Sequence, residues 1–277
     1  MNWEDYVAHE FSDEQKHGTL KIARAVESPQ LGNTRDVMIY LPPSYASSER
    51  RYPVIFMHDG QNLFDARTSF AGEWNVDETL DAASGEGLEA IVVGIGNTGA
   101  RITEYSPFDD VRHGQARGDA YLAFITDTLK PAVDAAFRTL VTREHTGIAG
   151  SSMGGLISLY AFFKRADVFG FAGVMSPALW YGQRGVFEFL KTVKHVGGRI
   201  YLDVGTQEGK PEVDDVARLR DRLVQLGYRE DQDLLYVIAP NAGHNESAWA
   251  TRWGRELRFL LGRAITRRQP RDPHRIA

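Results

Sequence analysis

Short apolar runs rich in β-branched residues recur along the whole chain, and most of them end at a glycine or a polar residue. Eight of these runs predict strands, at residues 21–26, 37–41, 54–57, 90–95, 146–149, 171–175, 200–204 and 234–238. Segments with helical character lie between the later runs, at residues 76–83, 119–137, 153–165, 213–226 and 248–261. The first two runs flank a Gly32-Asn33 turn, which favours an antiparallel pair, whereas the later runs are apolar without alternation, as is typical of parallel strands buried on both faces. The pattern predicts an α/β fold with a mostly parallel, eight-stranded sheet and helices on both faces.

Length and composition narrow the class of protein further. All 277 residues are expected to form one domain, with the polar and basic segment 267–277 as a flexible tail. The formal net charge of −5 argues against nucleic acid as a partner, and the absence of cysteine excludes disulfides, thiolate metal sites and thiol catalysis. The acidic N-terminus lacks the apolar core of a signal peptide, and no stretch reaches the ~18 apolar residues of a membrane span. We therefore expect a cytoplasmic protein without a membrane partner.

The segment Gly150-Ser151-Ser152-Met153-Gly154 fits the pattern G-x-S-x-G. It follows a predicted strand and opens a predicted helix, which is the context of a nucleophile elbow. Such a turn holds its serine in a strained backbone conformation and projects the hydroxyl from the top of the sheet. The N–H of Met153 is expected at the helix N-terminus, where it has no intrahelical partner and can stabilise negative charge. Ser152 is thus the candidate nucleophile and Met153 a candidate oxyanion donor; the alternative is that Ser152 only caps the helix.

A serine hydroxyl is a weak nucleophile and needs a neighbouring base. In proteins with this kind of elbow, the acid and then the base follow the nucleophile in chain order. His244 lies directly after the last predicted strand and is therefore the candidate base, with a loop-capping role as the alternative. His58 also follows a strand, but it precedes Ser152 and fits better in the loop around the oxyanion.

The acid is expected after the strand at residues 200–204, where it would orient the base and stabilise its protonated form. Glu208 lies in the segment that follows this strand and is the first candidate. Asp214 and Asp215 are rivals, although their place at the start of a charged helix favours compensation of the helix dipole. Asp203 lies inside the strand and would need a partner there. A Ser–His dyad that works without an acid is also open.

Five segments carry a resemblance to a known family: YPVIFMHDGQNLFD (52–65), EWNVDETL (73–80), GIGNTGARITEYSPF (94–108), GIAGSSMGGLISLYA (147–161) and NAGHNESAWATR (241–252). With them the chain resembles the esterase D-like branch of the α/β-hydrolase superfamily. That branch includes siderophore esterases, feruloyl and acetylxylan esterases, and S-formylglutathione hydrolase. The resemblance extends from about residue 34 to residue 261, and the HDGQNLFD element is its most specific part.

The resemblance implies roles for further residues. The backbone N–H of Gln61 is implied as the second oxyanion donor, and Trp74, Arg101 and Trp249 are implied to line the substrate pocket. Packing at a helix start is the alternative for the two tryptophans. Members of this group often carry aspartate as the acid of the triad, whereas the matched position here is Glu208.

These observations predict a serine carboxylic ester hydrolase that works through an acyl-enzyme on a small-molecule ester. An acyltransferase with the same machinery is the nearest alternative, and a non-catalytic binding module on the same scaffold is a second. A metal-dependent hydrolase is disfavoured because the chain has no H-E-x-x-H pattern, so we expect no metal and no cofactor. Acylated sugars, siderophore lactones and small thioesters remain open as substrates, as does the oligomeric state.

Overall fold

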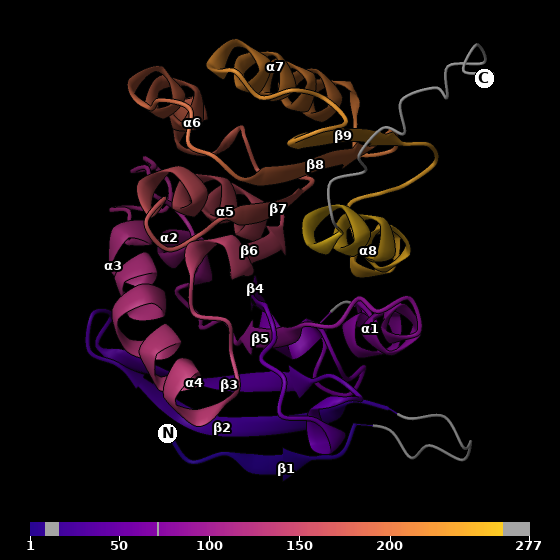
Figure 1. The fold of residues 1–277 in the computed structure, drawn as a ribbon. Coiled ribbons are helices and arrows are strands. Elements are labelled where there is room, and N and C mark those ends of the chain that lie inside the picture. The colour runs from indigo at the N-terminus through magenta and orange to yellow at the C-terminus, as the bar shows by residue number, and fades with distance from the viewer. Residues whose placement is uncertain (9–16, 71, 263–277) are drawn as a thin grey trace, which may run out of the picture.

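The computed structural model describes residues 1–8, 17–70 and 72–262, so the predicted tail at residues 267–277 lies outside the described residues. Its strands form one nine-stranded sheet in the order β1-β2-β3-β5-β4-β6-β7-β8-β9 (Figure 1). The strands are β1 (Glu4–Tyr6), β2 (Thr19–Ser28), β3 (Asn33–Leu41), β4 (Val54–His58), β5 (Ile91–Ile95), β6 (Thr146–Ser151), β7 (Phe171–Met175), β8 (Arg199–Gly205) and β9 (Leu234–Ala239). The pairings of β1 with β2, β2 with β3, and β3 with β5 are antiparallel, and all the others are parallel.

The predicted α/β class and the mostly parallel sheet are confirmed, but the expected count of eight strands is wrong. The additional strand is β1, which has the sequence Glu-Asp-Tyr and lies at the edge of the sheet with two of its three residues exposed. An edge strand of this kind pairs through its backbone and needs no apolar side chains, so it left no hydrophobic signal. The other eight strands overlap the eight predicted runs.

The helices are α1 (Val76–Ser84), α2 (Arg101–Glu104), α3 (Gly118–Ala123), α4 (Lys130–Ala136), α5 (Met153–Lys164), α6 (Tyr181–Thr192), α7 (Lys210–Leu226) and α8 (Glu246–Leu261). The predicted helix at residues 119–137 corresponds to α3 and α4 joined by a π-helical segment, Phe124–Leu129. The sequence did not predict α2 or α6. The start of α6 resembles a loop in sequence, and Gly182, Gln183 and Arg184 there have left-handed backbone angles.

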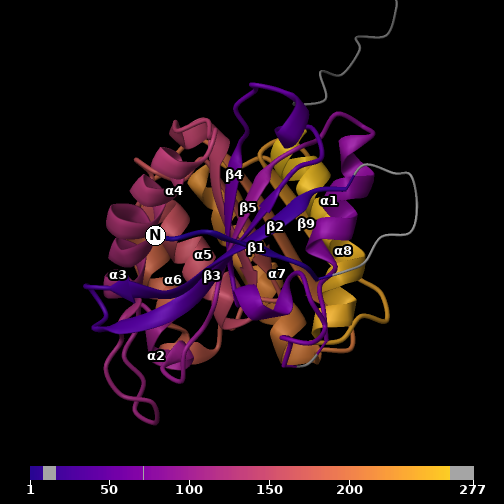
Figure 2. The same ribbon diagram turned by 90° about the horizontal axis from the view of Figure 1, so that it is seen from below.

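The helices divide between the two faces of the sheet (Figures 1 and 2). Apolar residues of α1 and α8 form one core cluster with side chains of the strands, and those of α3 to α7 form the other. Strands β4, β5, β6 and β7 are buried at every position, which explains why their sequences do not alternate between apolar and polar residues. The parallel strands end at one edge of the sheet, and the segments that follow them carry the predicted site residues.

Glu256 of α8 is an unusual charged residue because it lies wholly inside the core. Neither of its carboxylate oxygens has a hydrogen-bond partner among the described residues. It packs on β7 at Gly173, where an added Cβ would lie 1.6 Å from Oε1 of Glu256. Burial and then the nearby Asp203 raise the pKa of Glu256 well above its ordinary value, while Arg252 lowers it. The folded environment therefore favours the protonated form of this side chain.

Replacing Glu256 by glutamine should remove a pH-dependent loss of stability. Between the unfolded-state pKa and the raised folded-state pKa, the unfolded chain releases the Glu256 proton and the folded chain keeps it. The wild type therefore loses up to about 1.4 kcal/mol per pH unit relative to Glu256→Gln. Melting curves between pH 5 and pH 8 should show the Tm of the variant rising relative to the wild type as pH increases. The exposed Glu188→Gln is the matched control, and parallel Tm profiles for wild type and Glu256→Gln would contradict a protonated core carboxyl.

Candidate active site

Ser152 occupies a sharp turn between β6 and α5, so the predicted strand–turn–helix context is present. Its backbone angles are φ 57° and ψ −120°, a conformation that is costly for a residue with a Cβ. Two hydrogen bonds hold the turn against β7 and the segment that follows it: the Ser152 N–H donates to the Met175 carbonyl (3.0 Å), and the Ala178 N–H donates to the Ser152 carbonyl (2.9 Å). The residue directly follows the carboxyl end of β6 and is partly exposed.

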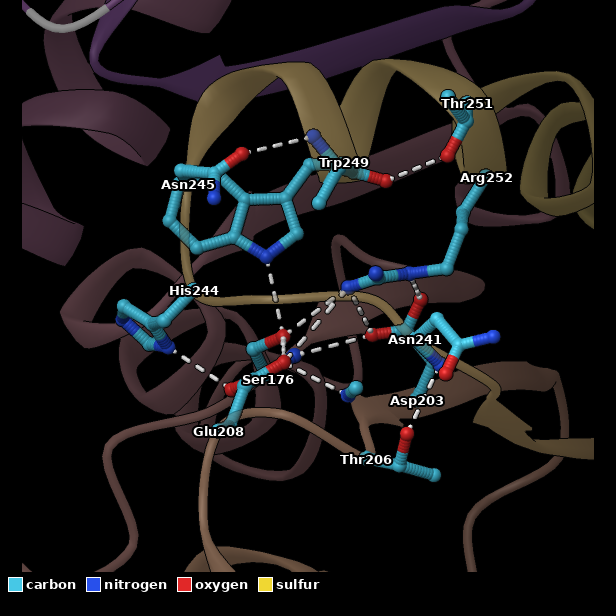
Figure 3. Close-up of polar contacts among 12 residues, drawn as sticks. Ser176, Asp203, Thr206, Glu208, Asn241, His244, Asn245, Trp249, Thr251 and Arg252 are labelled. Atoms are coloured by element: carbon cyan, nitrogen blue, oxygen red, sulfur yellow. Dashed lines mark hydrogen bonds and ion pairs between the residues drawn. The ribbon is translucent and has the colours of Figure 1, made fainter.

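His244 and Glu208 come together at the same edge from two different loops (Figure 3). Nδ1 of His244 lies 2.8 Å from Oε2 of Glu208, although the residues are 36 positions apart. The His244 side chain is 43% exposed and the Glu208 side chain only 2%. With Nδ1 directed to a carboxylate, Nε2 is left as the nitrogen that can accept a proton. Among the described residues, no direct hydrogen bond joins the Ser152 hydroxyl to His244.

The Glu208 carboxylate is held on both of its oxygens. Oε1 accepts hydrogen bonds from the Ser176 hydroxyl and from the Gly205 N–H, each at 2.6 Å. Burial raises the pKa of Glu208, but the hydrogen bonds from His244, Ser176 and the Gly205 N–H lower it by more. The pKa of this carboxyl therefore lies below its ordinary value, and the group is ionised at neutral pH.

The rival carboxylates make other contacts. Asp214 pairs with Lys210 (2.5 Å) on the exposed first turns of α7, and Asp215 pairs with Arg184 (2.9 Å). Asp203 is fully buried in β8, where its Oδ2 lies 2.6 Å from Nε of Arg252. None of the three carboxylates is hydrogen-bonded to His244 in the described structure.

Gln61 lies in a 3₁₀ turn, Gly60–Asn62, that follows β4. The turn packs so closely on β5 that a Cβ at Gly60 would lie 2.4 Å from the carbonyl carbon of Gly94. Within the described ranges, the N–H groups of Gln61 and Met153 donate to no acceptor of the chain. Both donors are therefore free for an oxygen atom of a ligand.

An ion pair anchors this turn. Asp59 has left-handed backbone angles (φ 56°), and its carboxylate accepts from both Nε and Nη2 of Arg101, each at 2.7 Å. The Asn97 side chain donates to the same carboxylate at 2.6 Å, and its backbone N–H donates to Oε1 of Gln61 at 3.2 Å. The guanidinium of Arg101 thus holds the segment that carries Gln61.

His58, at the end of β4, is buried beneath the Ser152 turn. Its Nδ1 lies 2.9 Å from the Tyr121 hydroxyl, and burial lowers the pKa of His58 to about 3. A Cβ at Gly150 or Gly154 would come within 2.9 Å or 3.2 Å of the His58 side chain. A neutral imidazole therefore packs directly against the turn and supports it from below.

Trp74 and Trp249 are both buried, with their ring centroids 5.7 Å apart. The Trp249 ring also meets the His244 ring edge to face at 5.0 Å, and its Nε1 donates to the Ser176 hydroxyl at 2.9 Å. Arg101 is one-quarter exposed beside its partner Asp59. Contact of these three pocket residues with a substrate stays a prediction.

Two buried residues near Glu208 were not found from the sequence: Ser176 and Arg252. Ser176 directly follows β7, so its place as a polar residue just beyond a buried strand was an available signal. Arg252 lies three residues after Trp249 on α8 and turns toward the sheet (Figure 3). An arginine among apolar residues of one helix gives no sign of its partner, which lies on β8.

Three carboxylates lie close together just before and within the first turn of α1: ligand atoms of Glu73, Asp77 and Glu78 are within 4.8 Å of one another, a spacing compatible with a metal ion. Burial and the neighbouring Glu78 raise the pKa of Asp77 to about 9. A proton on Asp77 at neutral pH reduces the repulsion among the three.

In the part of the chain that the structure describes, no helix is long and apolar enough to cross a membrane.

The amino-acid sequence is similar to those of known proteins. A family model described as "Putative esterase" matches residues 28–260. The chain is 26% identical over 247 residues to the uncharacterized protein YbbA of Bacillus subtilis, which covers 84% of this chain and 94% of that protein. It is 26% identical over 236 residues to the iron(III) salmochelin esterase of Escherichia coli strain CFT073, covering 79% of this chain and 52% of that protein.

The fold also matches solved structures. The crystal structure of the BES protein from Bacillus cereus superposes with a TM-score of 0.68 at 21% identity, covering 92% of this chain and 98% of that one. The likeness confirms the fold, and the family match extends over most of the chain. The chain belongs to the Putative esterase family and is a carboxylic ester hydrolase.

Proposed function

We propose that this esterase works through an acyl-enzyme, with Ser152 as the nucleophile, His244 as the base and Glu208 as the acid. The observation that carries the proposal is the 2.8 Å contact between His244 and the buried Glu208 at the edge where the strained Ser152 turn lies. In the first half of the reaction, Oγ of Ser152 attacks the ester carbonyl carbon and Nε2 of His244 takes the hydroxyl proton. Collapse of the tetrahedral intermediate breaks the ester C–O bond, and His244 returns the proton to the departing alkoxide.

The second half of the reaction repeats these roles with water. His244 takes a proton from a water molecule, the hydroxide attacks the acyl carbon, and the bond to Ser152 breaks as its oxygen regains the proton. The imidazolium that forms in each half is stabilised by Glu208, whose lowered pKa keeps it ionised. Because the His244 side chain is 43% exposed, water reaches the base, and this supports hydrolysis over acyl transfer.

The oxyanion of each tetrahedral intermediate is proposed to lie between the N–H groups of Met153 and Gln61. Neither group has another acceptor in the described chain, so no hydrogen bond has to be broken when charge develops. One such donor is worth about 3 kcal/mol in comparable chemistry. Arg101 is proposed to act mainly by holding Asp59 and the Gln61 turn in place, because both of its hydrogen bonds to Asp59 are charge-assisted.

The substrate is proposed to be a small-molecule ester that enters beside the Trp249 face of His244, with Trp74 packed behind it. One relative is named as an iron(III) salmochelin esterase and another as a siderophore triacetylfusarinine C esterase. A siderophore lactone is therefore the first natural substrate to test, alongside p-nitrophenyl esters of increasing chain length.

Ser152→Ala should lower kcat/KM for p-nitrophenyl acetate by about 10⁴-fold or more, because it removes only the attacking oxygen. His244→Ala should cost nearly as much, and the double variant should be no worse than either single one, since the two act as a unit. Equal melting curves control for folding. Residual activity of Ser152→Ala within tenfold of wild type would exclude Ser152 as the nucleophile. Wild-type activity that is lost in a chelator and restored by a divalent ion would point to metal catalysis.

Glu208→Gln should lower kcat/KM by about a hundredfold or more, because the imidazolium loses its charged partner while the base and the oxyanion donors remain. Asp214→Asn and Asp215→Asn are matched controls on the helix that follows, and both should keep the wild-type rate. All three are measured on one activated ester with melting curves alongside. A wild-type rate for Glu208→Gln combined with a collapse in either control would assign the acid elsewhere, whereas three wild-type rates would indicate a dyad.

Arg101→Gln should lower kcat about tenfold with a smaller change in KM. The substitution loosens the turn that carries Gln61, and it does not remove a contact with the substrate. Asp59→Asn removes the other half of the same ion pair and should have a similar effect. If Arg101 instead binds the substrate directly, Arg101→Gln will raise KM and Asp59→Asn will leave KM close to wild type. Steady-state kinetics on one ester distinguish these outcomes.

A further inference from the structure

The hydroxyl of Ser176 lies between the carboxylate of Glu208 and two donors from α8 (Figure 3). Its oxygen is 2.6 Å from Oε1 of Glu208, 2.9 Å from Nε1 of Trp249 and 3.1 Å from Nη2 of Arg252. All of these groups are buried or nearly so, and Ser176 itself is 2% exposed. The hydroxyl is therefore shielded from competing water.

The direction of these hydrogen bonds follows from the chemistry of the partners. Indole and guanidinium nitrogens only donate, so they use the two lone pairs of the Ser176 oxygen. The single hydroxyl proton must then point at Oε1 of Glu208. Because the Gly205 N–H donates to the same oxygen, Oε1 has two fixed donors, and Oε2 is the oxygen left to face His244.

Arg252 is fixed in turn by Asp203. Its Nε and Nη2 donate to the two Asp203 oxygens at 2.6 Å and 3.3 Å, and both side chains are buried. The Ser176 N–H donates to the Asp203 carboxylate (3.1 Å), so the same carboxylate holds the Ser176 backbone. Nη2 of Arg252 also lies 3.9 Å from Oε1 of Glu208. Breaking such a buried pair on one side leaves an unpaired charge, so its geometry is held firmly.

We propose that Ser176 is a positioning residue for the catalytic carboxylate, held by the buried Arg252–Asp203 pair, and that this anchor lets a glutamate serve as the triad acid. The inference rests on the proposed role of Glu208. A glutamate has one more rotatable bond than an aspartate, so its carboxylate needs fixed contacts to keep one oxygen on the base. Two donors on Oε1 supply them, and without the hydroxyl of Ser176 only the Gly205 N–H remains.

A double-mutant cycle between Ser176→Ala and Glu208→Gln tests this role. If Ser176 acts through Glu208, Ser176→Ala should lower kcat/KM for p-nitrophenyl acetate about tenfold in the wild type. In the Glu208→Gln background, Ser176→Ala should change kcat/KM by less than about twofold. A purely structural role would lower the Tm without this coupling. Ser28→Ala, another buried serine, is the matched control and should leave the rate unchanged in both backgrounds.

A second variant keeps the test valid if Ser176→Ala does not fold. Ser176 has φ 41°, a left-handed conformation that glycine adopts without strain, so Ser176→Gly removes the hydroxyl and suits the backbone. Either Ser176 variant can be combined with Glu208→Gln in the same double-mutant cycle. Equal losses in the two backgrounds, or no loss in the wild type, would overturn the inference and leave the triad standing. A wild-type rate for Glu208→Gln alone would overturn the triad and the inference together.

The pair behind Ser176 is tested by Arg252→Gln combined with Asp203→Asn, which leaves no buried charge unpaired. This double variant should lower kcat several-fold with little change in KM when Glu208 is present. In the Glu208→Gln background it should leave kcat nearly unchanged. Arg258→Gln, on the same helix but paired with Glu86 at the surface, is the matched control. A rate for the double variant equal to that of the control would show that Arg252 and Asp203 do not position the acid.

Discussion

Parallel pairing of the central strands is the constraint on which the site depends. Because β6, β7 and β8 run in the same direction and in register, Ser151 pairs with Met175, and Met175 pairs with Asp203. The segments that follow these strands therefore start side by side at one edge of the sheet. Groups that are far apart in the chain reach one another there without any long excursion of the backbone.

Backbone strain at the ends of the strands turns polar groups toward this edge. Ser152, Asp59 and Ser176 all have positive φ (57°, 56° and 41°), and each directly follows a strand. Such a conformation costs about 1–3 kcal/mol for a residue with a Cβ and persists only where neighbours hold it. Here the neighbours are hydrogen bonds to adjacent strands, the ion pair with Arg101 and the carboxylate of Asp203. The sheet and its ion pairs thus hold the turns in place, and the turns carry the polar groups of the site.

Three buried carboxyl side chains lie on β8, in the segment that follows β8 and on α8. Asp203 is paired with Arg252, Glu208 is stabilised as an anion by three donors, and burial favours the protonated form of Glu256. Each carboxyl thus meets the cost of burial in a different way: by an ion pair, by hydrogen bonds or by keeping its proton. Of these three carboxyls, only Glu208 faces a histidine, and this difference in surroundings separates the candidate acid from its neighbours.

The sequence alone determined the eight longer strands, the main helices, the turn at Ser152 and the places of His244 and Glu208 in the chain. These are local signals, since apolar runs, glycines and chain order follow from neighbouring residues. Tertiary structure decided the rest: edge strand β1, the pairing of Arg101 with Asp59, and the anchor formed by Ser176 and Arg252. The Ser176 and Arg252 side chains meet across 76 residues, and Arg101 reaches Asp59 across 42. Contacts over such separations leave no pattern in the local sequence, because only the folded sheet brings their partners together.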